Sequence, residues 1–475
     1  MKCNKRPSLT LIAAALALSC AAGAAQADVT IKINNLNAAG VGFNDPTPAT
    51  PVGGNTGTTL GEQRLIAFTY AANIWGKTLS SKTPIVINAQ FRPLSCTATG
   101  ATLGSAGATQ IFADFKGAIK PGTLYSYALA NKLYGGEISD TPGAQINANF
   151  NSNLGKPGCL TNTYFYLGLD SNHGANIDFV TVLLHEMGHG VGFQTFTNGA
   201  TGAQLAGYPS VWDHFLLDNT TNKTWVEMNN AERVASSLKP GGLSWTGAKV
   251  TQAVPKVLGA PEMRVTGAGA GAAGGMYAVA DAQFGPRLTN AGVTGQVMPV
   301  ALQSDSAGVA CTPLNAANAA AVKNSIALVS RGTCAFTIKV KNAQNAGAIA
   351  VIVSDNAPGA LAELGGADGS ITIPSVRISQ ADGALLAASL TKLNGNTSGT
   401  VASLGMSKTV LPGTDAAGRI TMYTPAVYQP GSSVSHYNTA AKRNQLMEPA
   451  INPDLTQANS APNDLTLELL KDIGW

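Results

Sequence analysis

The residues of this 475-residue chain whose types and spacing could do chemistry are two histidines that flank a glutamate. They are His185, Glu186 and His189, and positions i and i+4 lie on one face of a helix. Both imidazoles can therefore reach one metal ion. This is the His-Glu-x-x-His arrangement of zinc hydrolases, in which the metal lowers the pKa of a bound water and the glutamate is the general base. Only five histidines occur in the chain, which argues against two surface histidines standing at this spacing by chance.

The third ligand is not given by this motif. Catalytic zinc usually has three protein ligands and one open position. In the extended pattern a third histidine stands three residues after a glycine, and here Gly192 is followed at that place by Thr195. The ligand must then be remote. The candidates are His173, His214 and His436, or Glu232 on a following predicted helix.

A helix over residues 179–193 is needed to carry the motif, and apolar residues at helical spacing predict one there. The same criteria predict strands at 29–33, 84–91 and 164–169 and helices at 61–79 and 229–237. Beyond residue 280, strands at 326–330, 348–354 and 373–378 alternate with helices at 336–346 and 381–390, an α/β pattern. A last helix is predicted at 464–471, and the Gly/Ala run 266–275 is predicted to be a linker.

The segment from His185 to Phe193, followed far downstream by Ser435-His436-Tyr437 and Leu446-Met447-Glu448-Pro449, resembles the leishmanolysin family of metzincin zinc proteases. The resemblance implies that His436 is the third ligand, that Met447 is the Met-turn methionine beneath the zinc, and that Glu186 is the general base. Tyr437 stands where the family usually has tryptophan, and we consider it as an oxyanion stabiliser.

A second resemblance covers part of the interval between the histidines. Residues 326–336, 339–348 and 351–356 are similar to a protease-associated (PA) domain, a non-catalytic module that would contact substrate or gate access. The predicted fold is therefore α+β, with a zincin-type catalytic domain (a twisted sheet plus the active-site helix) interrupted by an inserted β-rich α/β domain. The predicted boundaries are 1–27 for a signal peptide, 28–265 and 409–475 for the two parts of the catalytic domain, and 280–405 for the insertion.

The first 27 residues have the features of a secretory signal, namely a basic start, an apolar run over residues 9–18 and a small-residue cleavage site at Ala25-Gln26-Ala27. No later stretch is long and apolar enough for a membrane helix, so a secreted protein without a membrane anchor, extracellular or periplasmic, is expected. Four cysteines remain after cleavage, an even number suited to an oxidising compartment. No Cys-x-x-Cys spacing suggests a metal site, and proximity favours the pairs Cys96–Cys159 and Cys311–Cys334.

Composition restricts the partners. Charged residues make up 12% of the chain, and the net charge of +4 falls to +1 once the three basic residues of the signal peptide are removed. Lysine and arginine do not cluster, which excludes a nucleic-acid binder that works by neutralising phosphates. The protease resemblance implies polypeptide substrates, and a monomer is the default state.

Two weaker site hypotheses concern aspartates. Asp170, Asn172 and Asp178 alternate around a glycine and could bind calcium, which prefers oxygen ligands, although a turn rich in Asp and Asn is the alternative. Asp213 could orient a zinc histidine.

Taken together, the motif and the two resemblances predict a secreted zinc endopeptidase. The alternatives are a zincin whose third ligand is Glu232, and a secreted polypeptide-binding protein with a structural or inactive zinc site.

Overall fold

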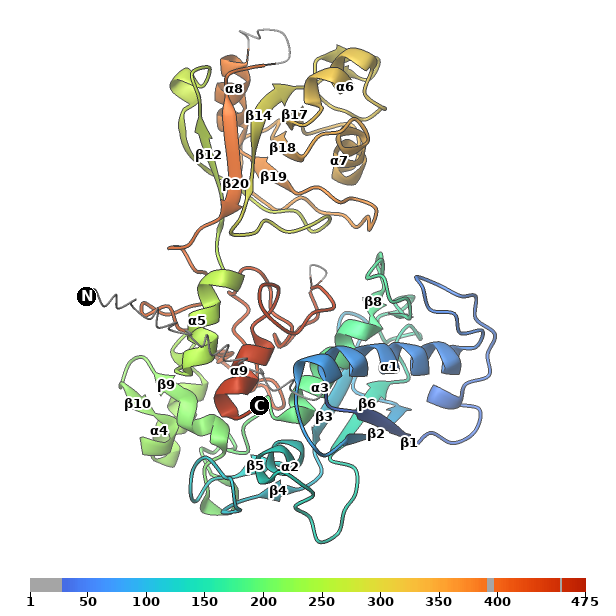
Figure 1. Ribbon diagram of the computed structural model, residues 1–475, viewed down its shortest axis with the longest axis vertical. Helices are drawn as coiled ribbons and strands as arrows, with labels where there is room; N and C mark the ends of the chain where they lie inside the picture. The colour runs from blue at the N-terminus through green and yellow to red at the C-terminus, as the bar shows by residue number, and fades with distance from the viewer. Residues whose placement is uncertain (1–27, 391–396, 453–454) are drawn as a thin grey trace, which may run out of the picture.

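The computed structural model describes residues 28–390, 397–452 and 455–475, and the predicted signal peptide lies outside them. The described chain forms two bodies, one above the other in Figure 1. Residues 28–258 and 410–475 share one hydrophobic core and are called the lower body. Residues 261–406 have two core clusters of their own and are called the upper body. The fold is mixed α+β, and the chain leaves the lower body once and returns to it once.

The sheet of the lower body has the strand order β1-β2-β6-β3. The first three strands are parallel, and β3 is antiparallel to β6 and lies at the edge. Buried and half-exposed residues alternate along β2, as expected when one face of a strand covers a core. The other face carries a row of amides, in which Asn88 bonds to Asn34 and to Asn147. The strands are β1 (Ile31–Asn35), β2 (Ile85–Arg92), β3 (Gly104–Ala108) and β6 (Ile146–Asn151).

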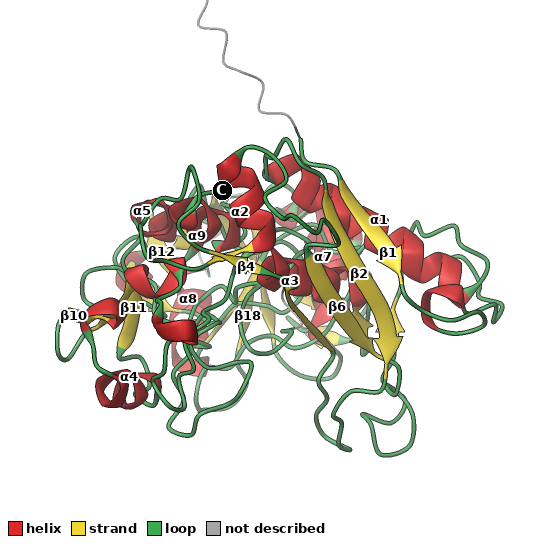
Figure 2. Ribbon diagram, turned by 90° about the horizontal axis from the view of Figure 1, so that it is seen from below, coloured by secondary structure: helices red, strands yellow, loops and turns green. Residues whose placement is uncertain are grey.

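Helices α1 (Leu60–Thr78) and α3 (Phe179–Val191) pack against this sheet and against each other (Figure 2). A capping box of Thr59 and Glu62 starts α1. Asp178 caps the start of α3, and Gly192 ends it with φ = 128°, a conformation that favours glycine. All 13 residues of α3 are buried, so the helix that carries the motif lies inside the body.

The remaining elements of the lower body surround this centre. A three-stranded sheet has the order β10-β9-β11, and the pairs β4-β5 and β7-β8 are short. The Cys96–Cys159 disulfide joins the loop before β3 to the loop after β6. The helices are α2 (Tyr127–Tyr134), α4 (Asn230–Ser237), α5 (Ala248–Val257) and α9 (Thr466–Ile473). The strands are β4 (Ile111–Phe112), β5 (Tyr125–Ser126), β7 (Phe165–Tyr166), β8 (Ile177–Asp178), β9 (Leu216–Asp218), β10 (Lys223–Thr224) and β11 (Leu243–Trp245).

A seven-stranded sheet of order β13-β12-β20-β14-β17-β18-β19 forms the upper body. The strands from β14 to β19 are parallel, and the pairs from β13 to β14 are antiparallel. A disulfide joins Cys311 to Cys334, so both predicted pairs are present. The strands are β12 (Pro261–Thr266), β13 (Gly275–Ala278), β14 (Val293–Pro299), β15 (Leu302–Gln303), β16 (Ser306–Ala307), β17 (Ile326–Ser330), β18 (Ala350–Ser354), β19 (Ser375–Ile378) and β20 (Val401–Met406), and the helices are α6 (Ala316–Val322), α7 (Phe336–Asn345) and α8 (Gln380–Ser389).

The Gly/Ala run 266–275 is not the linker that its composition indicated. It connects β12 to β13 within the sheet, and Ala270 and Ala273 are buried in the upper core next to α8. Small residues allow the close approach, because a Cβ at position 267 would lie 2.2 Å from the carbonyl oxygen of Gly399. The run therefore belongs to the upper body.

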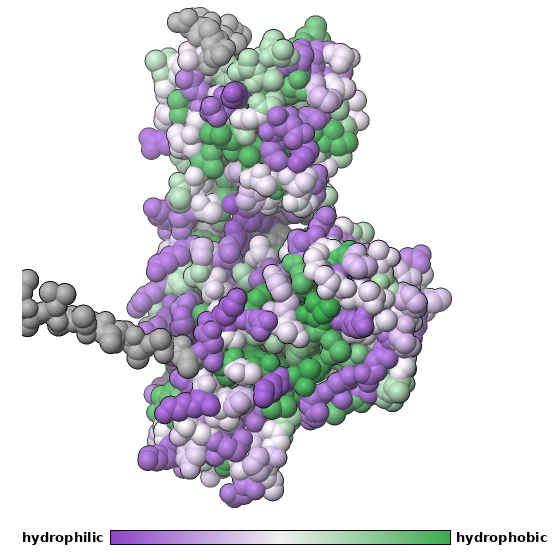
Figure 3. Space-filling model, turned by 45° about the vertical axis from the view of Figure 1, so that its right-hand side comes forward, coloured by the Kyte–Doolittle hydropathy of each residue, from purple (hydrophilic) through white to green (hydrophobic). Residues whose placement is uncertain are grey.

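The two connections between the bodies lie side by side, because β12 and β20 pair with Pro261 opposite Met406. Beyond these strands, the contacts between the bodies include an ion pair of Lys442 with Glu363 at 3.5 Å and a hydrogen bond from Asn290 to the Pro255 carbonyl. On the face in Figure 3, hydrophilic side chains gather where the bodies meet. Among the helices of the described residues, none has the length and apolar character to cross a membrane.

Candidate metal centre

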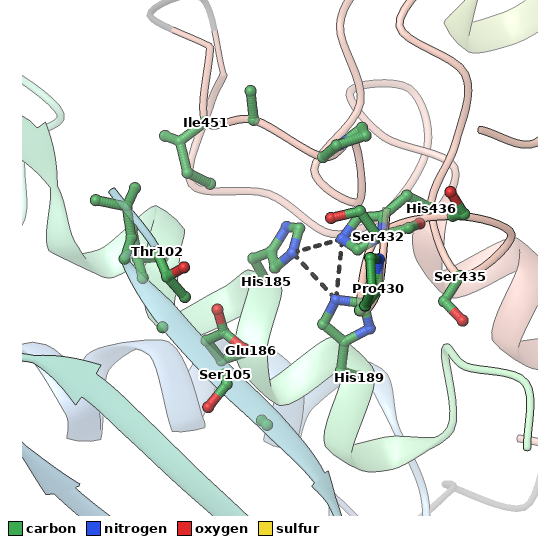
Figure 4. A pocket seen from close by; sticks show the side chains of 18 of the residues that line it. Thr102, Ser105, His185, Glu186, His189, Pro430, Ser432, Ser435, His436 and Ile451 are labelled. Atoms are coloured by element: carbon green, nitrogen blue, oxygen red, sulfur yellow. Dashed lines mark hydrogen bonds between the residues drawn. The ribbon is translucent and has the colours of Figure 1, made fainter. Parts of the chain in front are cut away.

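Three histidines from distant parts of the chain converge in the lower body. His185 and His189 lie on one face of α3, and His436 comes from the segment that returns after the upper body (Figure 4). The Nε2 atoms of His185 and His189 are 3.2 Å apart, and the Nε2 atom of His436 lies 3.2 Å and 3.1 Å from them. All three side chains are buried. Among the described Asp, Glu, His and Cys residues, this is the one group of three or more that could hold a metal ion.

Backbone carbonyls fix the protonation state of each ring. A carbonyl oxygen only accepts, so each Nδ1 must carry the proton and each Nε2 must present a lone pair. Burial also lowers the pKa of His185 to about 4 and that of His189 to about 3, and the pKa of His436 is lowered well below its ordinary value. The Nδ1 atoms lie at 2.7, 2.8 and 2.8 Å from the carbonyl oxygens of Leu446, Phe193 and Ser432, respectively.

These nitrogens fit a zinc ion. Three lone pairs at 3.1–3.2 Å cannot bond to one another, and a cation between them would satisfy all three. Tetrahedral zinc with bonds of about 2.0–2.1 Å holds its nitrogen ligands about 3.3–3.4 Å apart. The spacing in the structure is within 0.3 Å of that geometry, and the ring nitrogens are ligands that zinc prefers.

Glu186 lies beside the three histidines, at the floor of a cavity of about 870 Å³. Its carboxylate rests against strand β3, where a Cβ at Gly104 would lie 2.6 Å from Oε1. Burial raises the pKa of Glu186 to about 8 in the metal-free protein. Its Oε2 atom is buried and has no hydrogen-bond partner among the described residues. The carboxylate of Glu186 thus has one oxygen whose hydrogen-bonding capacity is unused, next to the three histidines.

Met447 lies directly against α3. A Cβ at Gly188, between the two helical histidines, would be 2.7 Å from the Met447 Sδ atom, so a side chain at 188 would displace the thioether. The turn is held on both sides. The Leu446 N–H donates to the Asp464 carboxylate at 2.6 Å, and the Tyr437 N–H donates to the Met447 carbonyl at 2.8 Å.

The turn after α3 contacts the returning segment. The Thr195 N–H donates to Ser435 Oγ at 3.2 Å. Thr195 stands where the extended zinc motif would place its third histidine. Ser435, the residue before His436, therefore contacts the position that the third histidine occupies in the extended motif.

The other candidate ligands lie elsewhere. Glu232 is on α4, where it forms an ion pair with Lys223. His214 bonds to Thr123 through Nε2, and His173 bonds to the Asn176 carbonyl through Nδ1. None of these three candidates joins the cluster of His185, His189 and His436.

Two further assignments do not match the structure. Tyr437 is fully buried, packs edge-on against Phe193 and does not line the cavity, so the geometry gives it no part in stabilising an oxyanion. Asp213 bonds to Thr195 and Thr197, whereas the three clustered histidines bond to backbone carbonyls. It does not orient a zinc histidine directly.

The calcium hypothesis conflicts with the roles of its residues. The Asp178 carboxylate caps α3 and accepts from Val180 N, Thr181 Oγ1 and Gln457 Nε2. Asp170 accepts from the Tyr166 hydroxyl and the Asn172 N–H, which makes a turn. A helix cap and a turn thus account for the oxygen-bearing side chains between Asp170 and Asp178. This agrees with the alternative hypothesis of a turn rich in Asp and Asn.

Sequence reasoning missed the strand that faces the metal centre. Strand β3 has the sequence Gly-Ser-Ala-Gly-Ala, without the β-branched or aromatic residues that favour strands. Leu103, Gly104, Ser105 and Ala106 line the cavity, and Thr102, Ser105 and Glu186 are seen together in Figure 4. The small residues are the one signal, since they permit the helix and the strand to approach closely.

Comparison with known families identifies part of the upper body. Residues 293–386 match the family model of the PA domain, so the chain contains a PA domain. A receptor homology region, transmembrane domain- and RING domain-containing protein from Oryza sativa subsp. japonica is 40% identical over 107 residues, which are 22% of this chain. The match spans 19% of that plant protein.

Solved structures with local similarity include peptidases. A zinc aminopeptidase from Bacillus subtilis is 23% identical, with 33% of this chain and 36% of that chain covered and a TM-score of 0.22. An aminopeptidase from Aneurinibacillus sp. strain AM-1 is 20% identical, with 42% of each chain covered and the same TM-score of 0.22. A subtilisin-like protease from Pseudoalteromonas sp. AS-11 is 22% identical, with 34% and 35% covered and a TM-score of 0.22. These TM-scores are too low to support a common overall fold.

Proposed function

We propose that this protein is a secreted zinc-dependent endopeptidase of the metzincin type, with a PA domain inserted between its second and third zinc ligands. The observation that carries the proposal is the convergence of three buried histidine Nε2 atoms at 3.1–3.2 Å, with the Glu186 carboxylate beside them. The two disulfides support an oxidising compartment outside the cytoplasm.

His185, His189 and His436 would hold the zinc ion through their Nε2 atoms. When bound, zinc supplies a Lewis acid and lowers the pKa of a water molecule. Glu186 then accepts a proton from the attacking water at its carboxylate and donates it to the nitrogen of the leaving amine.

An extended polypeptide would bind along the edge strand. Strand β3 pairs with β6 on one side only, and residues 101–106 line the cavity. Its other edge can therefore donate and accept backbone hydrogen bonds with a substrate strand. Such binding does not depend on the substrate's side chains, which suits a general endopeptidase.

The test uses the mature chain, loaded with zinc and assayed on casein with and without a chelator. Glu186→Gln should lower kcat at least about 100-fold, the lower range for a general base, while one zinc per chain still binds. His436→Ala should lose zinc affinity. His214→Ala is the control, because that half-buried ring lies outside the cluster and should leave zinc affinity unchanged. Full activity of Glu186→Gln would reject the mechanism, and zinc retained by His436→Ala but lost by Glu232→Ala would favour the other ligand set.

A second candidate function is polypeptide binding through the PA domain, with the zinc site structural. The match of residues 293–386 to the PA family favours it over other non-enzymatic functions. A zinc-loaded protein that binds unfolded casein and does not cleave it would support this function and reject the endopeptidase.

A further inference from the structure

The metal centre depends on two chain segments that meet after a long detour. His189 and His436 are 247 residues apart in sequence, and their Nε2 atoms are 3.1 Å apart. An error of 1 Å in the position of the returning segment would remove His436 from the coordination geometry. Something in the lower body must therefore hold the returning segment against the end of α3.

The short helix η3 (Val211–Phe215) lies behind this junction. Its Asp213 is fully buried, and its carboxylate accepts from Thr195 Oγ1 at 2.6 Å, Thr197 Oγ1 at 2.5 Å and Ser210 N at 2.9 Å. Two of the three donors belong to the turn after α3. Asp213 therefore fixes the course of that turn.

The turn that Asp213 fixes also contacts the returning segment, because Thr195 N donates a hydrogen bond to Ser435 Oγ at 3.2 Å. A polar chain thus runs from Asp213 through Thr195 to Ser435, the residue before His436. We call these three residues the polar clasp. The clasp ends one peptide unit from the third histidine.

An aromatic chain runs parallel to the clasp. Trp212, next to Asp213, packs on Phe193 with ring centroids 4.7 Å apart, and Phe193 packs on Tyr437 at 5.0 Å. Its three rings come from the same three segments as the clasp, and all three are fully buried. Phe193 also accepts from His189 Nδ1 through its carbonyl. The apolar chain supplies packing, whereas the hydrogen bonds of the clasp fix the register.

We propose that Asp213 is a positioning residue for the metal centre, which places His436 by holding Thr195 against Ser435. This inference rests on the proposed function, because it takes His185, His189 and His436 as the zinc ligands. Asp213 touches neither a ligand ring nor the cavity, so its effect must pass through the clasp.

Asp213→Asn is the main variant. It keeps the size of the side chain but replaces one accepting oxygen by a donor that faces other donors. Asp218→Asn is the matched control, since Asp218 is also buried, follows η3 closely and accepts two backbone N–H groups of a turn outside the clasp. Tryptophan fluorescence and zinc affinity, by chelator competition, are measured for both.

We expect Asp213→Asn to weaken zinc binding about 10- to 100-fold. A loss of this size is common when a residue that supports a metal ligand is mutated. It should also shift the visible absorption bands of the cobalt-substituted protein. Asp218→Asn should do neither. In a His436→Ala background the additional effect of Asp213→Asn on zinc affinity should vanish, because the ligand that the clasp places is already gone.

Equal zinc affinities of Asp213→Asn and Asp218→Asn would overturn the proposal, and so would an undiminished effect of Asp213→Asn in the His436→Ala background. If Asp213→Asn does not fold, Thr195→Val removes one hydroxyl of the clasp, and Thr195→Ser should restore the affinity that Thr195→Val loses. Equal affinity of Thr195→Val and the wild type would also overturn it. Failure of the wild type to bind zinc through the three histidines would instead reject the proposed function.

Discussion

The contact between Gly188 and Met447 predicts that the effect of Gly188→Ala on stability changes sign when Met447 is replaced by alanine. Alanine in place of glycine usually stabilises a helix interior by about 1 kcal/mol. At position 188 the added Cβ would lie 2.7 Å from the Met447 Sδ atom and 3.3 Å from its Cε atom. Normal contacts of carbon atoms are roughly 3.5–4.0 Å.

Overpacking of this kind costs about 1–3 kcal/mol. In the wild-type background, Gly188→Ala should therefore lower the free energy of unfolding by up to about 2 kcal/mol. Met447→Ala alone leaves a cavity and should cost about 2–5 kcal/mol. In the Met447→Ala background the next atom near the new Cβ belongs to Trp75 at 3.6 Å, an ordinary contact. There Gly188→Ala should gain about 1 kcal/mol from helix propensity.

Urea unfolding of the metal-free protein measures this cycle, since bound metal would add its own stabilisation. Tryptophan fluorescence is the suitable probe, because all five tryptophans of the chain, Trp75, Trp212, Trp225, Trp245 and Trp475, belong to the lower body. A coupling of about 1–3 kcal/mol is expected between the two sites. If Gly188→Ala has the same effect on unfolding in both backgrounds, Met447 does not pack against α3 as described.

Three other predictions follow from the site and the disulfides. Gly104→Ala places a Cβ 2.6 Å from Glu186 Oε1, so kcat/KM on casein should fall at least about tenfold while zinc content stays the same. Replacing Cys96 and Cys159 by serine removes a disulfide that closes a loop of 63 residues, and it should lower the free energy of unfolding measured by tryptophan fluorescence by about 4 kcal/mol. Removing the Cys311–Cys334 disulfide of the upper body should leave the midpoint of that fluorescence transition unchanged. In the metal-free protein, the folded-state pKa of Glu186 is raised to about 8 from 4.5. The stability that the protonated carboxyl contributes is therefore complete below pH 4.5 and falls steadily until the pH has passed 8. Glu186→Gln should therefore stabilise the metal-free protein by up to about 3 kcal/mol at pH 7 and not at pH 4.5, as urea unfolding at the two values would show.

Local patterns predicted the helix of the metal centre well. The helix expected over residues 179–193 is α3 (Phe179–Val191), because its apolar spacing and Gly192 act within a few residues. The strand predicted at 326–330 is β17 with the same bounds, since a fully buried parallel strand is a continuous apolar run. These elements depend on information inside their own segments.

Contacts between distant segments could not be predicted in the same way. From the residues alone, three histidines and Glu232 remained open as third ligands, and only the family resemblance favoured His436. What brings His436 to α3 is tertiary, including the bond of Thr195 to Ser435 across 240 residues. Strand β3 owes its form to pairing with β6, which overrides the weak strand propensity of its small residues.

The position of the insertion has a consequence for biosynthesis. The histidines of α3 are made at least 247 residues before His436, an interval of roughly 12–50 s at about 5–20 residues per second. A chain that ends anywhere in this interval carries two of the three proposed ligands and lacks Met447. Premature termination thus yields a product that cannot complete the metal centre. If the proposed function holds, the order of the ligands along the chain keeps unfinished copies inactive.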